Sequence, residues 1–220
     1  MLVLALDTAT PAVTAGVVEL TADGLRTRGA SIAHDPRKHG ELLIPGVLAA
    51  CAEAGITLQD IEAVVTGIGP GPFTGLRVGM VTAASLGDAL GVPVHGVCSH
   101  DAIAAEVVAA GPFLVVTDAR RREVYWAAYN GTGRTHGPAV DAPAVLAARV
   151  AELGVVAAAG ALADTVGLPV LEPSSATPEG LVAVAADALR TGADPGLLEP
   201  LYLRRPDAQE MSARKRVTTG

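Results

Sequence analysis

The amino-acid sequence predicts an α/β protein with a duplicated fold. Two segments, VLALDTATPAVTAGVV and LVVTDARRREVYWAAY, each read as an apolar strand, a turn that opens with aspartate and a returning strand, which indicates a weak internal repeat. Between and after them, strand-like apolar runs alternate with longer helix-like runs, as is typical of α/β proteins. With 220 residues, 50% of them hydrophobic, the chain is long enough for one large domain or two small ones.

Three segments at the amino end are predicted to form an antiparallel meander. Each is rich in apolar and β-branched residues and is bounded by turn residues. The three segments cover residues 2–6, 13–20 and 26–33. The first of them ends at Asp7, directly before a sharp turn.

A helix is predicted over residues 41–53, with Pro45 in its first turns, where proline costs least. No charged residue lies between Leu42 and Ala52. A helix that is apolar on nearly every side needs a second covering surface in addition to its own sheet.

The segment over residues 61–91 reads as a buried strand, a tight glycine-proline loop and a helix over 74–90. A glycine-rich loop that enters a helix can cradle a phosphate group. Here Pro70 and Pro72 supply no N–H donors, and no Lys-Ser/Thr pair follows the last glycine. The sequence therefore favours a rigid strand-to-helix turn.

The helix over residues 74–90 is the second one that is too apolar for a single buried face. Small residues recur at every fourth position, and such a stripe allows another helix to approach closely. The stripe consists of Gly75, Gly79, Ala83 and Gly87. We expect a surface outside this lobe to cover the helix.

The remaining segments continue the alternation. Strands are predicted over residues 93–97, 113–117, 123–129 and 155–159, and helices over 99–110, 140–153 and 181–190. Residues 201–203 read as a last strand or an extended segment.

Composition excludes several classes of function. The net charge of −7 disfavours a chain that binds nucleic acid by itself. Cys51 and Cys98 lie far apart in apolar surroundings, which is typical of reduced thiols in the cytosol. No signal peptide is recognisable, and no run reaches the ~20 apolar residues of a membrane span. We therefore expect a cytoplasmic protein without membrane contact.

The sequence gives little support for a metal site or for a catalytic nucleophile. His34 and His39 flank one loop, but no two histidines form an i,i+4 pair, so ordinary histidines are favoured over a metal site. The Gly-Xaa-Ser-Xaa-Gly motif is absent, and Cys51 lies among alanines in a helix. The adjacent residues Ser99–Asp101 cannot form a triad with one another, and Ser99 is expected to cap a helix.

Two aspartates are candidate site residues. Asp7 and Asp118 each end a strand at a sharp turn, and in a duplicated fold they would face one cleft. That geometry suits a nucleotide site with a magnesium–water network. Equally, both side chains could serve only to satisfy turn amides. The residues alone leave the two interpretations open.

Four stretches together resemble the TsaB/YeaZ family of the actin-like ATPase superfamily, over residues 1 to 207. They read LALDTAT, GIGPGPFTGLRVG, TDARRREVYWA and LYLRRP. The resemblance implies a two-lobed actin-like ATPase (ribonuclease H-like) fold, in which each lobe is a mixed sheet flanked by helices. We expect residues 1–99 with 195–208 to form the N-terminal lobe and 100–194 a smaller C-terminal lobe, leaving 209–220 as a disordered tail.

The family role implied is that of a non-catalytic subunit in tRNA threonylcarbamoyladenosine biosynthesis. A TsaD-like catalytic subunit would be its partner, with a TsaE-like ATPase, in a complex that modifies the adenosine beside the anticodon in tRNAs that read codons beginning with A. ATP would be used through these partners, with no intrinsic cofactor, and tRNA would be contacted through the complex. Alone, the chain would form a homodimer.

The sequence departs from the superfamily pattern at its functional positions. Actin-type phosphate loops read Asp-Xaa-Gly, whereas Ala9 and Arg120 stand at the glycine positions here. The catalytic relatives carry metal-binding histidines on the first helix, where this chain has Leu42, Leu43 and Val47. These departures imply that the chain has no catalytic, nucleotide or metal site of its own.

The two over-apolar helices are the predicted interface with the catalytic partner. Its predicted residues are Leu42, Leu43, Pro45, Gly46, Leu48, Ala49, Gly75, Leu76, Gly79, Met80, Ala83 and Gly87. Two other functions stay open. One is a stand-alone peptidase or small-molecule kinase of the same superfamily. The other is a tRNA-binding module that uses Arg204, Arg205, Arg214, Lys215 and Arg216.

Overall fold

The computed structural model describes residues 1–204. Its strands are β1 (Leu2–Asp7), β2 (Ala12–Leu20), β3 (Leu25–His34), β4 (Ala63–Gly67), β5 (Val94–Val97), β6 (Phe113–Asp118), β7 (Val124–Asn130), β8 (Gly133–Asp141), β9 (Ala157–Ala159) and β10 (Val170–Leu171). Its helices are α1 (His39–Ala54), α2 (Phe73–Leu90), α3 (Ser99–Ala104), α4 (Pro143–Leu153) and α5 (Pro178–Thr191), with single 3-10 turns at η1 (Leu58–Asp60) and η2 (Ala163–Val166).

The ten strands form two mixed sheets that repeat one topology. The first sheet has the order β3-β2-β1-β4-β5 and the second the order β10-β9-β6-β7-β8. In each, an antiparallel meander is extended on its other side by two parallel strands. The internal repeat and the two-lobed α/β fold with mixed sheets are therefore confirmed, and Asp7 and Asp118 end equivalent strands, β1 and β6.

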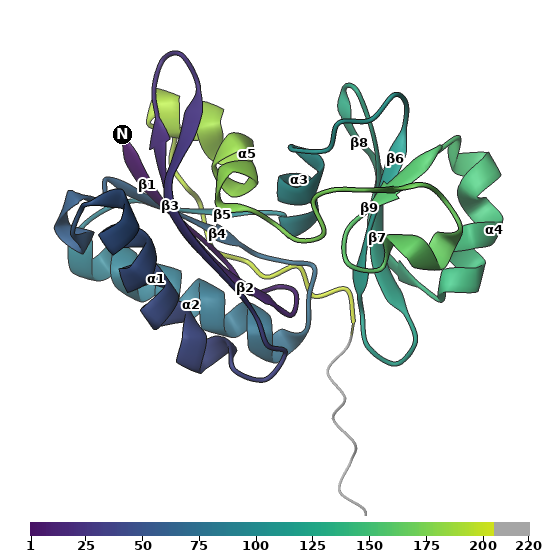
Figure 1. Ribbon diagram of the computed structural model, residues 1–220, viewed down its shortest axis with the longest axis horizontal. Helices are drawn as coiled ribbons and strands as arrows, with labels where there is room; N and C mark the ends of the chain where they lie inside the picture. The colour runs from purple at the N-terminus through teal and green to yellow at the C-terminus, as the bar shows by residue number, and fades with distance from the viewer. Residues whose placement is uncertain (205–220) are drawn as a thin grey trace, which may run out of the picture.

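The elements stack in layers, with helices outside and between the sheets (Figure 1). Helices α1 and α2 cover the outer face of the first sheet, around a core that includes Leu4, Val17 and Val64. Helices α3 and α5 lie between the two sheets in a second core. A third core, around Trp126 and Leu146, joins the second sheet to α4 and η2.

The packing of helix α5 differs from the predicted division of the chain into two lobes. Residues 181–190 are helical as predicted, but α5 packs on β1, β2 and β3 of the first sheet, although it falls within the span assigned to the C-terminal lobe. It does so because Leu181, Val182 and Leu189 supply an apolar face for the inner side of that sheet. The segment after α5 also returns to the first lobe, where Leu201 N donates to Ile68 O at 2.8 Å.

One predicted helix end is wrong, and one strand was not predicted. Helix α3 ends at Ala104 rather than near residue 110. The strand β8 is absent from the predictions because it pairs only with β7 and its first five residues are exposed, so its sequence lacks apolar alternation. Residues 201–203 belong to no strand, which leaves the second predicted alternative, a segment outside the sheets. No helix within residues 1–204 is both long and apolar enough to cross a membrane.

Candidate functional site

Asp7 is sealed inside the first lobe. Its side chain is 1% exposed, Oδ2 accepts a hydrogen bond from Ser99 Oγ at 2.5 Å, and Oδ1 accepts one from Ala9 N at 2.9 Å. Gly67 leaves room for the carboxylate, since a Cβ there would collide with Oδ2. Burial raises the pKa of Asp7 to about 6, against the lowering effect of its hydrogen bonds.

Ser99 therefore orients a buried acid, and the expected helix cap does not form. The cap position of α3 is Cys98, which makes no side-chain capping bond. The sequence could not reveal this role because 92 positions separate Ser99 from Asp7.

Asp118 satisfies its own turn. Its Oδ1 accepts from Arg120 N at 2.7 Å, and its Oδ2 lies 3.4 Å from Arg120 Nη1. Asp7 likewise binds the amide two residues ahead. No group of three or more His, Cys, Asp or Glu side chains within residues 1–204 is placed to hold a metal ion. Both aspartates therefore accept hydrogen bonds from turn amides, which is one of the two roles that the sequence left open.

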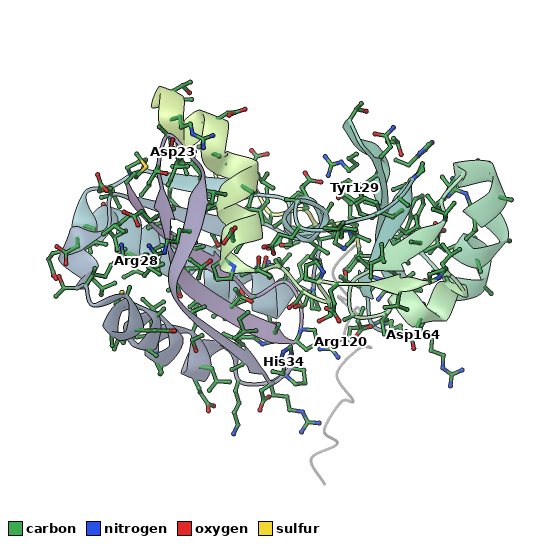
Figure 2. The ribbon with its side chains drawn as sticks, turned by 45° about the horizontal axis from the view of Figure 1, so that its top comes forward. Asp23, Arg28, His34, Arg120, Tyr129 and Asp164 are labelled. Atoms are coloured by element: carbon green, nitrogen blue, oxygen red, sulfur yellow. The ribbon has the colours of Figure 1, made fainter. Side chains whose placement is uncertain are left out.

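The turn after Asp118 has unusual backbone geometry. Arg120, Arg121 and Arg122 all have positive φ, at 65°, 52° and 65°. Side chains other than glycine rarely adopt this left-handed region, and such strain tends to occur at functional sites. This feature was not predicted, because its only signal in the sequence is three consecutive arginines in a tight turn. Figure 2 shows Arg120 where the two lobes meet.

A hollow of about 430 Å³ lies beside the first turn of α2. Its lining includes Thr8, Thr10, Arg37, His39, Gly75 and Arg120. The start of α2 has no side-chain cap and no acidic residue in its first turn. The start of α2 and the guanidinium groups of Arg37 and Arg120, the latter already beside Asp118, favour negative over positive charge in this hollow.

The stripe of small residues on α2 faces the chain's own sheet rather than a partner. A Cβ at Gly75 would meet Thr8 O, one at Gly79 would meet Thr8 Oγ1, and one at Gly87 would meet the Val94 side chain. The residues of the stripe are small because Thr8, in the turn after β1, and Val94, in β5, lie directly beneath the helix. This overturns the expectation that it is an open packing surface.

Burial divides the twelve predicted interface residues into two groups. Eight of them are covered within the chain: Leu43, Gly46, Gly75, Leu76, Gly79, Met80, Ala83 and Gly87. They cannot contact a partner directly, because they pack on the sheet or the neighbouring helix. The four that remain accessible all lie on α1: Leu42, Pro45, Leu48 and Ala49.

Three of these four residues, Pro45, Leu48 and Ala49, belong to a larger apolar surface, which we call the outer face of α1 and α2. We define it by Ile44, Pro45, Leu48 and Ala49 on α1 and by Val78 and Val81 on α2. Ile44 is 43% exposed, Leu48 53% and Val81 64%. A groove of about 460 Å³ runs beside Val78 and Val81 and reaches Gly40 on α1. Ile44 and Val81 were not among the predicted interface residues, which were chosen mainly along the stripe of small residues.

The basic carboxyl end is only partly described. Arg204 forms an ion pair with Glu123, so its charge is compensated within the chain. Arg205, Arg214, Lys215 and Arg216 lie outside the described residues, so the suggested tRNA-binding tail stays a prediction.

Comparison with known proteins gives consistent results. Residues 32–177 match the family described as TsaD: tRNA N6-adenosine threonylcarbamoyltransferase. An uncharacterised protein of Mycobacterium tuberculosis is 53% identical over 212 residues, which cover 96% of this chain and 95% of that protein. The Escherichia coli tRNA threonylcarbamoyladenosine biosynthesis protein TsaB is 37% identical over 147 residues, or 64% of this chain and 62% of its own length.

The fold has a close counterpart among solved structures. YeaZ from Pseudomonas aeruginosa aligns with a TM-score of 0.67 at 26% identity, and the alignment covers 92% of this chain and 99% of that one. A second Pseudomonas aeruginosa structure, described as similar to the peptidase YeaZ, aligns with a TM-score of 0.72 at 28% identity. The chain therefore has the predicted two-lobed actin-like fold, is a TsaB/YeaZ-like protein, and belongs to the family described as TsaD, tRNA N6-adenosine threonylcarbamoyltransferase.

Proposed function

We propose that this chain is a non-catalytic subunit in tRNA threonylcarbamoyladenosine biosynthesis, and that it binds a TsaD-like catalytic subunit through the outer face of α1 and α2. The pathway is supported by the family match and by the names of the TsaB relatives. The main support for this interface is the outer face itself, where the aliphatic side chains of Ile44, Leu48 and Val81 are exposed to solvent on two neighbouring helices.

The solvent-facing side of a surface helix is normally polar and charged. On α1, however, no charged residue lies between Leu42 and Ala52, and Ile44 and Leu48 are separated by one helical turn. On α2, Val81 extends the apolar surface. Exposed aliphatic side chains that gather on two neighbouring helices are typical of sites of protein association. A homologue with the same fold can pack its own first two helices here, which makes a helical bundle.

The same surface accounts for self-association. When no catalytic partner is present, two copies can bury their outer faces against each other in an isologous dimer. The catalytic partner then competes with the second copy for one surface. Partner binding and homodimer formation are therefore mutually exclusive in this proposal.

A non-catalytic role is supported by the interior of the first lobe. Asp7 is enclosed by Ser99 and Gly67, so its carboxylate cannot reach a substrate without rearrangement. Leu43 and Val47 are buried in the core at positions where the resemblance places metal-binding histidines in catalytic relatives. In this proposal a TsaE-like ATPase consumes ATP, and tRNA is bound by the assembled complex.

The test is a double variant, Leu48→Asp with Val81→Asp, co-expressed with the TsaD-like protein of the same organism. Both side chains are exposed, so we expect thermal unfolding to match the wild type while capture of the partner falls by at least tenfold. The matched control is Val108→Asp, at a valine that is 91% exposed in the second lobe. Threonylcarbamoyladenosine in cellular tRNA, measured by mass spectrometry, should fall only with the double variant.

Full partner capture by the folded double variant would contradict the interface. The stand-alone enzyme makes a different prediction. Peptidase or ATPase activity of the isolated chain that disappears in Asp7→Ala would contradict the non-catalytic role and support the enzyme.

A further inference from the structure

The second lobe contains a cavity of about 570 Å³ that the proposed function does not use. It lies between α3, the loop over residues 105–112 and the ends of β7 and β8. Much of its wall is aliphatic or aromatic: Ala104, Val107, Ala109, Ala110, Pro112 and Phe113. This size and composition fall in the range of small-molecule sites.

Three polar side chains from different elements meet at one side of the cavity. Tyr129 Oη donates to Asp101 Oδ1 at 2.7 Å, and Arg134 Nη1 lies 3.2 Å from the same oxygen. Arg134 Nη1 also donates to Cys98 Sγ at 3.4 Å. Figure 2 places Tyr129 in the second lobe. Burial raises the pKa of Tyr129, so the phenol stays protonated and keeps Asp101 oriented.

Both charged groups retain unused hydrogen-bonding capacity. The contacts of the Asp101 carboxylate use Oδ1, and within residues 1–204 its Oδ2 accepts no hydrogen bond. The contacts of Arg134 use Nη1, which leaves the donors on Nη2 and Nε. The two side chains remain 27% and 34% exposed. The cavity wall therefore offers an acceptor and a donor of opposite charge next to each other.

We propose that this cavity binds a free α-amino acid with an aliphatic side chain. Its ammonium group donates to Asp101 Oδ2, and its carboxylate accepts from Arg134. Its side chain packs on the wall formed by Val107, Ala109 and Pro112. A zwitterion matches the pair in both charges and leaves neither one desolvated without a partner.

Other classes of ligand fit less well. A phosphate ester would bring negative charge beside Asp101, where repulsion opposes its attraction to Arg134. A wholly apolar molecule would remove Asp101 Oδ2 and the free donors of Arg134 from water without giving them a partner. A simple carboxylate or amine would satisfy only one of them. The chemistry of the wall thus favours a ligand with both charges on one small body.

The test titrates the full-length chain with L-leucine and follows backbone amide shifts by nuclear magnetic resonance. Isocaproate and isoamylamine are the matched probes, since each keeps the aliphatic body but lacks one charged group. Loss of one charge-assisted hydrogen bond is expected to weaken binding about tenfold. Shifts should concentrate on the cavity residues. Saturable leucine binding with weaker binding of both probes supports the proposal.

Two variants connect binding to the cavity. Ala110→Trp places a large ring at the cavity wall from an exposed position, so the fold should persist and leucine binding should be lost. Val108→Ala, in the same loop but outside the lining, should bind as the wild type does. No saturable binding to the wild type, equal binding of all three probes, or unchanged binding in Ala110→Trp would overturn the proposal. None of these results bears on α1 or α2, so the proposed function stands or falls separately.

Discussion

Ser99 Oγ donates a hydrogen bond to the fully buried carboxylate of Asp7 across 2.5 Å. This contact joins the start of α3 to the end of β1 and closes the place where the sequence suggested an open cleft. The first prediction concerns its effect on stability. Burial raises the pKa of Asp7 from 3.8 to about 6, so between these pH values the folded state binds a proton that the unfolded state has lost.

The contribution of Asp7 to the free energy of unfolding therefore decreases as pH rises from 4 to 6. Above pH 6 the buried ionised carboxylate lowers the free energy of unfolding by a constant amount. Asp7→Asn removes this titration, its amide oxygen can still accept from Ala9 N, and its amide NH2 can donate to Ser99 Oγ. We expect the variant to gain up to about 3 kcal/mol relative to the wild type at pH 7.5, and less at pH 4. Urea unfolding at both values measures the difference. Asp118→Asn is the matched strand-end control, and an equal gain there would refute the assignment.

The second prediction concerns the contact between α2 and the turn that follows β1. Thr8 Oγ1 donates to Gly75 O at 2.8 Å and accepts from Gly79 N at 3.0 Å, so the turn and the helix are held at close range. Gly79→Ala would push a methyl group into Thr8 Oγ1. We expect it to lower the free energy of unfolding by about 1–3 kcal/mol.

Gly40→Ala on α1 is the control for this prediction, since a Cβ there meets no heavy atom within 4 Å. It should leave stability unchanged or raise it by about 0.5–1 kcal/mol, as alanine does in helices. If Gly79→Ala were equally harmless, the stripe would be loosely packed and could again be considered as a surface for a partner.

The sequence predicted the elements whose own residues carry the signal. The strands β1, β4 and β6 are continuous apolar runs, and their role as buried strands follows from composition alone. The strand β8 is exposed and exists because β7 provides backbone partners, which no local pattern records. The repeat was visible because duplicated strands and turns keep their order.

The site could be predicted only in part, because spacing identifies a helix face but not its neighbour. Recurrence of Gly75 and Gly79 indicates close approach of another backbone, and both a partner helix and the chain's own β1 satisfy that condition. Similarly, nothing in arginine chemistry indicates a left-handed turn at Arg120. The enclosure of Asp7 depends on Gly67 and Ser99, which are distant in sequence and meet only in the folded chain.

The third prediction concerns His100, which is fully buried at the start of α3. Its Nε2 lies 2.8 Å from Thr117 Oγ1, and its Nδ1 has no hydrogen-bond partner within residues 1–204. Burial, reinforced by the charge of Arg134, lowers the pKa of His100 from 6.5 to about 3. Between these values the unfolded chain binds a proton that the folded chain excludes.

Stability contributed by neutral His100 is therefore present above pH 6.5 and is lost as pH falls toward 3, which is opposite in sign to the effect of Asp7. His100→Gln keeps a polar atom near Thr117 but does not titrate. When the pH falls from 7.5 to 4.5, the free energy of unfolding of the variant should decrease by roughly 2–3 kcal/mol less than that of the wild type. Urea unfolding measures both losses, and the exposed His136→Gln should behave as the wild type. Equal losses of stability by His100→Gln and the wild type on acidification would mean that His100 is protonated in the folded state. Its Nδ1 would then have to donate to a group that the structure does not place beside it.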